Sequence, residues 1–299
     1  MGVVRASLLS LLVLMACGLV LLFVRLYRAQ RERERQPWRW PGVDLLTIGF
    51  VTDFLDTLGI GSFATTTALF RAARALPDRL LPGTLNVGHA LPTVLQALFY
   101  IVAIEVDVLT LIALIASSML GAYLGAGVVS RLSERSVRLG VGSALVAAAL
   151  LLLARLYDVL PPGSESLELR GTALALGVLG NFVLGALMTL GIGLYAPCMI
   201  LVSLLGMNPK AAFPIMMGSC AFLMLVAAPR FVREQGFALR PALGLALGGL
   251  PGVWIAANVV KELELTTVRW LVLFVVVYTA VSLLLAARVR STPDVQPSA

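Results

Sequence analysis

Residues 108–129 read VLTLIALIASSMLGAYLGAGVV, an apolar run without a charged side chain. As an α-helix this run is about 33 Å long, enough to cross the hydrocarbon core of a bilayer. Comparable apolar runs occur at 8–26, 139–156 and 271–287. Because these runs are apolar on every side and do not alternate in polarity, they predict membrane-spanning helices and argue against a β-barrel.

The composition of the whole chain agrees with an intramembrane fold. Hydrophobic residues make up 59% of the 299 residues and charged residues 13%, and the mean hydropathy is +0.95. Soluble domains contain roughly one quarter charged residues. Cys17, Cys198 and Cys220 lie in apolar runs without CxxC spacing, so they predict neither a disulfide framework nor a zinc site.

The N-terminal apolar run, residues 6–26, has two interpretations. Leu14-Met15-Ala16-Cys17 resembles a lipoprotein cleavage site, but the run continues beyond Cys17 to Leu26, which favours an uncleaved helix. Six arginines follow within residues 25–39. Since basic loops stay on the cytoplasmic side of a membrane, this distribution predicts an N-terminus outside the cell.

The remaining charges follow the same pattern. With the chain crossing the membrane alternately, the predicted inner segments contain seventeen of the 23 basic residues. A net charge of +7 that is spread over short loops indicates membrane topology rather than a nucleic-acid surface. We therefore expect a multi-pass protein of the plasma membrane with a cytoplasmic C-terminus. The inner segments are 25–39, 71–79, 131–138, 230–240 and the C-terminal tail.

The two halves of the chain are similar to each other. With the sequence shifted by 132 positions, a Thr-Leu-Gly-Ile-Gly motif and two prolines coincide. Agreement of glycine and proline patterns in one register is not expected by chance in leucine-rich sequence. The coinciding pairs are Phe50 and Phe182, Thr57 to Gly61 and Thr189 to Gly193, Ala64 and Ala196, Leu69 and Leu201, Pro77 and Pro209, and Pro82 and Pro214.

This repeat predicts an all-α, polytopic transmembrane bundle. Each half contains five helical segments, and an odd number gives the two copies opposite orientations, as in many secondary transporters. The two segments beside each glycine motif are either two thin spans or one re-entrant hairpin. The expected segments are 43–58, 63–76, 83–104, 108–130 and 137–157, then 171–190, 194–206, 212–229, 241–260 and 268–287. The expected organisation is an N-terminal helix and basic loop (1–40), repeat one (41–160), inverted repeat two (161–290) and a tail (291–299).

The glycine motifs are the first candidates for a substrate site. Glycine weakens a helix and exposes backbone N–H groups, and a helix that begins after the break presents its positive end to an anion. Two such helix starts, one in each repeat, would converge near the midplane. The alternative is that these glycines only allow close helix packing. The candidate substrate-binding residues here are Gly59, Gly61, Ser62 and Thr65 in the first copy and Gly191, Gly193, Pro197 and Cys198 in the second.

Two carboxylates and a histidine are the candidates for ion coupling. Asp53 and Asp56 share a helix face within an apolar segment, where an ionised carboxylate is costly unless it faces water or a partner. His89, the single histidine of the chain, lies one turn after Asn86. A proton carrier and a purely structural hydrogen-bonding role are both compatible with these residues. Thr84, Asn86, His89 and Ser219 complete the candidate substrate-binding set.

Other small residues predict helix packing rather than chemistry. The sequence contains no P-loop, HExxH, GxSxG or haem-attachment motif, so we expect no enzyme, no ATP-driven pump, no metal and no cofactor. The packing residues are Ser117, Ser118, Gly121 and Gly125 in one half and Gly248, Gly249, Gly252 and Ala256 in the other.

The motif from Gly49-Phe50 through Asp53 and Asp56 to Gly59 and Gly61, followed by Pro82-Gly83-Thr84 and a degenerate second copy, resembles the TauE/SafE family of sulfite and organosulfonate exporters over about residues 43–287. The chain has Gly-Ile-Gly-Ser where the family commonly has three or four glycines, and the second copy lacks both aspartates. The resemblance implies transport of sulfite, sulfonates or related sulfur or carboxylate anions, coupled to an ion gradient.

The sequence therefore predicts a secondary transporter of small anions in the lipid bilayer, without a nucleic-acid partner. Two other functions stay open: a passive anion channel, and a membrane enzyme or assembly factor that acts on a lipid-borne substrate. The sequence is also compatible with a homo-oligomer.

Overall fold

The computed structural model describes residues 2–34, 40–58, 61–157, 159, 165–191, 193–208, 211–258 and six positions between 273 and 285. The regular secondary structure of this described part is helical, apart from one isolated β-bridge between Ser166 and Met207. The all-α prediction is therefore confirmed. Most of the expected segment 268–287 and the whole tail 291–299 lie outside the described residues.

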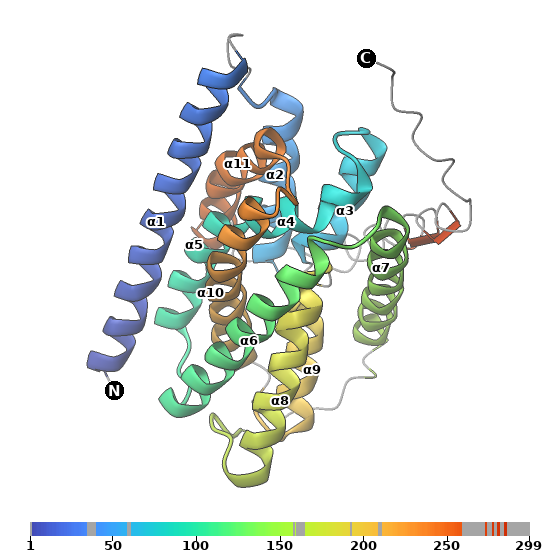
Figure 1. Cartoon of the computed structure of the whole chain (residues 1–299). Helices are drawn as coiled ribbons and strands as arrows, with labels where there is room; N and C mark the ends of the chain where they lie inside the picture. Colours follow the sequence, from blue (N-terminus) through green and yellow to red (C-terminus); the bar gives the residue numbers. More distant parts are fainter. Residues whose placement is uncertain are drawn as a thin grey trace.

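Eleven α-helices and one short 3₁₀-helix account for the described chain (Figure 1). Six helical stretches among the described residues are long and apolar enough to cross a membrane, which supports a multi-pass membrane protein. The elements are α1 (Gly2–Glu34), α2 (Val43–Thr57), α3 (Ser62–Ala72), η1 (Asp78–Leu80), α4 (Leu81–Gly88), α5 (Ala90–Ala103), α6 (Val108–Val129), α7 (Glu134–Leu156), α8 (Gly171–Met188), α9 (Tyr195–Leu204), α10 (Ala212–Arg233) and α11 (Leu239–Asn258).

The two glycine motifs form the turns of two helical hairpins, α2–α3 and α8–α9. Gly61 has a φ of 91° and Gly191 a φ of 100°, a left-handed conformation that glycine adopts without steric cost. At 1.5 Å per residue, α3 with 11 residues and α9 with 10 are too short to span a bilayer. Figure 1 shows α2–α3 in one half of the molecule and α8–α9 in the other. The short α3 and α9 favour the re-entrant alternative over two full spans.

Close backbone contacts fix the long helices against the hairpins. A Cβ atom at Gly248 of α11 would lie 2.0 Å from the carbonyl oxygen of Leu46 in α2, and one at Gly121 of α6 would lie 2.0 Å from that of Phe182 in α8. Small residues permit this approach in membrane proteins. The packing role predicted for Gly121 and Gly248 is confirmed, and α2 pairs with α11 as α8 pairs with α6.

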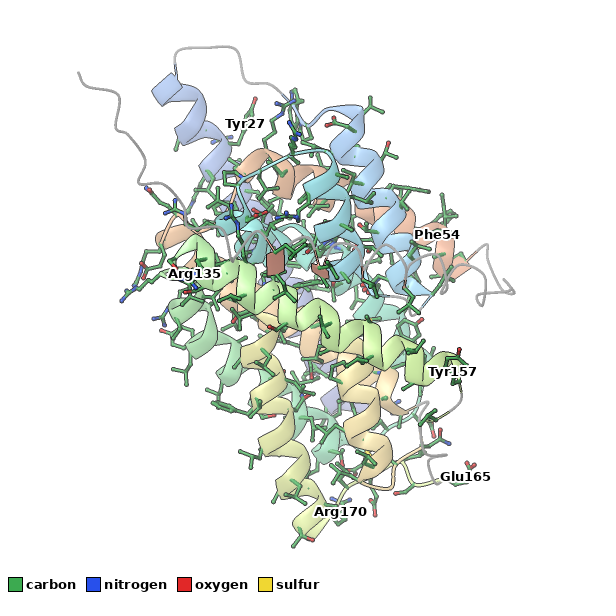
Figure 2. All side chains as sticks on the ribbon, turned by 90° about the vertical axis from the view of Figure 1, so that its right-hand side faces the viewer. Tyr27, Phe54, Arg135, Tyr157, Glu165 and Arg170 are labelled. Atoms are coloured by element: carbon green, nitrogen blue, oxygen red, sulfur yellow. The ribbon has the colours of Figure 1, made fainter. Side chains whose placement is uncertain are left out.

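Helices α5 and α10 pack against each other at the centre of the bundle, between these two pairs. Most of α10 is buried. At His89 the regular helix is interrupted, so the expected single segment 83–104 consists of α4 and α5. Helix α1 packs on the periphery, where it contacts α5 and α10, and α7 lies on another side with Arg135 and Tyr157 at its opposite ends (Figures 1 and 2).

Candidate functional site

The interruption between α4 and α5 places a buried hydrogen-bonded pair beside the first hairpin. His89 Nδ1 lies 2.9 Å from Oδ1 of Asp53, and its Nε2 lies 2.9 Å from the Thr66 hydroxyl. Asp53, Thr66 and His89 are all 0% exposed. With Nδ1 protonated and donating to the carboxylate, Nε2 accepts the Thr66 proton in the neutral ring. The pair therefore joins α2 and α3 to the junction of α4 and α5.

Asp56, one turn after Asp53, binds the start of α3. Its Oδ1 accepts a hydrogen bond of 2.9 Å from the backbone N–H of Ser62, and its Oδ2 accepts one of 3.1 Å from Nε2 of Gln96. Gln96 Nε2 also donates to the Thr57 hydroxyl at 3.0 Å. A carboxylate at the N-terminus of a helix is stabilised by the unpaired N–H groups of the first turn. Asp56 thus closes the hairpin across the glycine turn.

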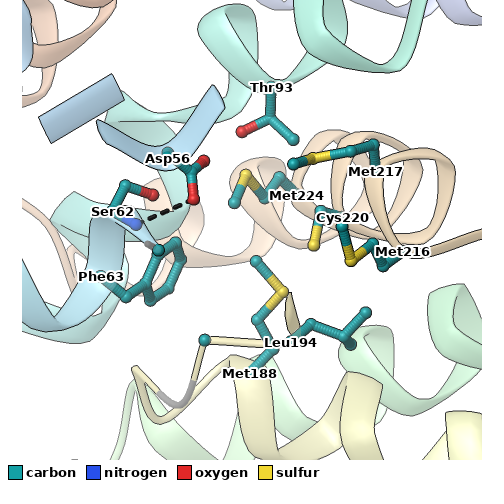
Figure 3. Close-up of a pocket in the computed structure, with 12 residues that line it drawn as sticks. Asp56, Ser62, Phe63, Thr93, Met188, Leu194, Met216, Met217, Cys220 and Met224 are labelled. Carbon is teal, nitrogen blue, oxygen red and sulfur yellow. Dashed lines mark hydrogen bonds between the residues drawn. The ribbon is translucent and has the colours of Figure 1, made fainter. Parts of the chain in front are cut away.

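A small cavity lies between the two hairpins, α5 and α10 (Figure 3). The space that the centre of a water molecule can occupy in it is about 20 Å³. The cavity therefore has room for roughly one water molecule. In this conformation the space is smaller than an oxyanion. Its lining residues are Asp56, Gly61, Ser62, Phe63, Thr93, Met188, Gly193, Leu194, Met216, Met217, Cys220 and Met224.

A family model described as "Sulfite exporter TauE/SafE" matches residues 2–152, half of the chain. The chain belongs to the TauE/SafE family. This match begins at α1 and ends within α7, whereas the resemblance in the sequence was expected over 43–287. The comparisons with curated proteins and with solved structures give no match.

At the level of the TauE/SafE family, the chain is a membrane exporter of small anions and not an enzyme. Among its described residues, no group of three or more His, Cys, Asp or Glu side chains is arranged to hold a metal ion. The cavity lies where the α2–α3 and α8–α9 hairpins meet inside the helical bundle.

The cavity contains four of the residues that the sequence singled out: Asp56, Gly61, Ser62 and Gly193. Asp53 and His89 lie behind Asp56 and do not line it. Gly59 falls outside the described residues.

The other candidates make structural contacts in this conformation. The Thr84 hydroxyl accepts a hydrogen bond of 2.9 Å from the backbone N–H of Ala238, and the Thr65 hydroxyl donates at 2.9 Å to the carbonyl of Ser62. Asn86 donates to the carbonyl of Pro82 at 2.8 Å and to that of Met188 at 3.4 Å. The Asn86 side chain therefore connects α4 to the end of α8.

Apart from Gly193, the second-copy candidates are not among the residues that line the cavity. Ser219 accepts a hydrogen bond of 2.9 Å from Asn181 Nδ2. Gly191 forms the turn before α9, Pro197 is half-buried in the first turn of α9, and Cys198 is buried.

Besides the apolar Phe63 and Leu194, sequence reasoning missed two kinds of lining residue. The first is Thr93, a hydroxyl on α5. The second is a group of sulfur-containing side chains, Met188, Met216, Met217, Met224 and Cys220. Met188 could have been identified from the sequence, because the shift of 132 positions aligns it with Asp56. The α10 methionines have no such signal, since methionine in an apolar helix looks like ordinary core.

Proposed function

We propose that this TauE/SafE protein is a secondary transporter that moves small sulfur oxyanions, sulfite or organosulfonates, across the plasma membrane through the cavity between its two hairpins. One observation carries the proposal: two helical hairpins reach the same cavity from opposite halves of the molecule. A site between two such elements is typical of transporters that work by alternating access.

The repeats supply the moving parts in this proposal. Positions related by the shift of 132 line the cavity in pairs: Gly61 with Gly193, Ser62 with Leu194, and Asp56 with Met188. Helix α2 packs on α11 as α8 packs on α6. Both facts support two inverted repeats that rock against each other around a fixed site.

The electrostatics of the cavity support coupling to protons. Asp56 is the ionisable acid among the described lining residues, and no lysine or arginine is found among them. An anion cannot enter beside an ionised carboxylate at low dielectric without a large repulsion. We therefore infer that one proton, carried by Asp56, accompanies the anion. Asp53 and His89 hold α2 in place behind it.

The test is sulfite flux into proteoliposomes with and without a pH gradient. We expect Asp56→Asn to keep the fold but to lose the dependence on the pH gradient, because the amide cannot release a proton. Asp44→Asn is the matched control, since Asp44 lies exposed in the first turn of the same helix. It should behave like the wild type.

Each outcome has a defined meaning. Wild-type protein without saturable flux would refute the transporter, and unsaturable flux would favour the passive channel. A pH dependence that persists in Asp56→Asn would remove Asp56 from the coupling. A product formed by the wild type from a membrane lipid would support the membrane enzyme instead.

A further inference from the structure

Apart from Phe63 and Leu194, the side chains around the cavity form two groups by chemistry. Asp56, Ser62 and Thr93 gather on one side, which we call the polar wall. The opposite part, the sulfur wall, consists of four methionines and a cysteine (Figure 3). The members of the sulfur wall are Met188, Met216, Met217, Met224 and Cys220.

Thr93 is the unusual member of the polar wall. It is 1% exposed, and its hydroxyl oxygen has no hydrogen-bond partner among the described residues. The Asp56 oxygens, by contrast, already accept hydrogen bonds from Ser62 and Gln96. A buried hydroxyl without a partner costs free energy, and most such groups in proteins are paired. Since Thr93 lines the cavity, its partner must come from the cavity itself: a water molecule when the site is empty, and a ligand oxygen when one is bound.

The sulfur wall, unlike the polar wall, disfavours contact with the oxygen atoms of a ligand. A thioether donates no hydrogen bond and is a weak acceptor, so an oxyanion oxygen that faces it loses its water without replacement. A polarisable apolar surface suits a part of the ligand that carries no charged oxygen. Methionine side chains also adapt their shape readily, which allows the wall to yield when the closed cavity admits a ligand.

We infer that the cavity selects oxyanions with one oxygen-free face, and that Thr93 is the residue that binds their oxygens. Sulfite fits, because its three oxygens lie on one side of the sulfur and a lone pair on the other. A short alkyl sulfonate fits with its carbon toward the methionines. Sulfate does not, because its fourth oxygen would face the sulfur wall. This inference rests on the proposed function and adds a rule of selectivity to it.

The first experiment tests Thr93 by substrate half-saturation in proteoliposomes. Thr93→Val keeps the shape and removes the hydroxyl, so we expect the half-saturating sulfite concentration to rise about tenfold. Thr93→Ser keeps the hydroxyl and should stay near the wild type. Thr67→Val is the matched control, because the Thr67 hydroxyl is also buried without a partner in the described part of the chain but does not line the cavity.

The second experiment measures competition against sulfite in wild-type protein. Methanesulfonate should compete, and sulfate should need at least about a tenfold higher concentration. Met217→Gln adds an amide donor to the sulfur wall and should narrow the gap between sulfate and sulfite. Equal competition by sulfate, or an unchanged half-saturating sulfite concentration in Thr93→Val, would overturn the inference. The proposed function would still stand in either case if the wild type transports sulfite.

Discussion

At the scale of single residues, the Asp53–His89 pair shows what sequence can and cannot give. An aspartate inside an apolar segment and a lone histidine both stand out in the sequence, because ionisable side chains are costly and rare within a membrane. Their pairing does not, because they are 36 positions apart and meet through the interruption between α4 and α5. Thr93 could not be singled out either, since a threonine in an apolar helix is ordinary.

The Asp53–His89 pair also leads to a stability prediction. Because both side chains are fully buried, His89→Ala leaves the Asp53 carboxyl without its main partner, which costs about 3–5 kcal/mol. The double variant Asp53→Ala/His89→Ala removes the uncompensated group as well. We expect the single variant to unfold at a lower temperature than the double variant in a detergent thermal-shift assay. With Asp53→Ala measured as well, a loss in the double variant equal to the sum of the two single losses would show that the two side chains are not coupled.

At the scale of elements, the sequence predicted most helices within a few residues. The lengths of the apolar runs and the positions of glycine and proline contain that information. The exceptions have local causes. In place of the expected segment 63–76, α3 ends at Ala72. Arg74 adopts a φ of 49° in the turn that follows. The sequence could not decide between re-entrant hairpins and two thin spans, since both alternatives give the same topology.

Helix pairing leads to a prediction with an internal control. In Gly248→Ala the new methyl group meets the Leu46 carbonyl, so α2 and α11 must separate, at a cost of about 1–3 kcal/mol. Gly18→Ala in α1 has nothing within 4 Å of the new methyl group. We expect the first variant to lower the unfolding temperature and the second to leave it unchanged or raise it, since alanine favours helix. A neutral Gly248→Ala would contradict the close approach of these helices.

At the scale of the whole molecule, the ion pairs of the described residues lie at the ends of helices. Tyr27 and Arg170 lie at opposite ends of the molecule in Figure 2. At the end with Arg170, this arginine pairs with Asp107 and Glu168, while Arg5 donates to the carbonyl of Val106 at 3.2 Å. Three further ion pairs lie at the C-terminal ends of α3, α6 and α10 and at the start of α7. These pairs are Arg71 with Asp78, Arg138 with Asp78, and Arg131 with Glu234.

The sidedness of these ends can be tested directly. From the basic loops we predict that the end with Arg170 faces outside and the end with Arg131 faces the cytoplasm. In a background with Cys17, Cys198 and Cys220 replaced by alanine, a membrane-impermeant maleimide should label Glu168→Cys in intact cells. Ser133→Cys should react only after lysis. The reverse pattern would invert the proposed topology.

Asp56 was described above as the acceptor that binds the first turn of α3. If the same carboxyl group takes up the travelling proton, its neutral form accepts the Ser62 N–H less strongly than the charged form does. Loading a proton would then loosen the tip of one hairpin, and unloading would tighten it. The free energy of the proton gradient would thereby be converted into movement of this hairpin through a single hydrogen bond.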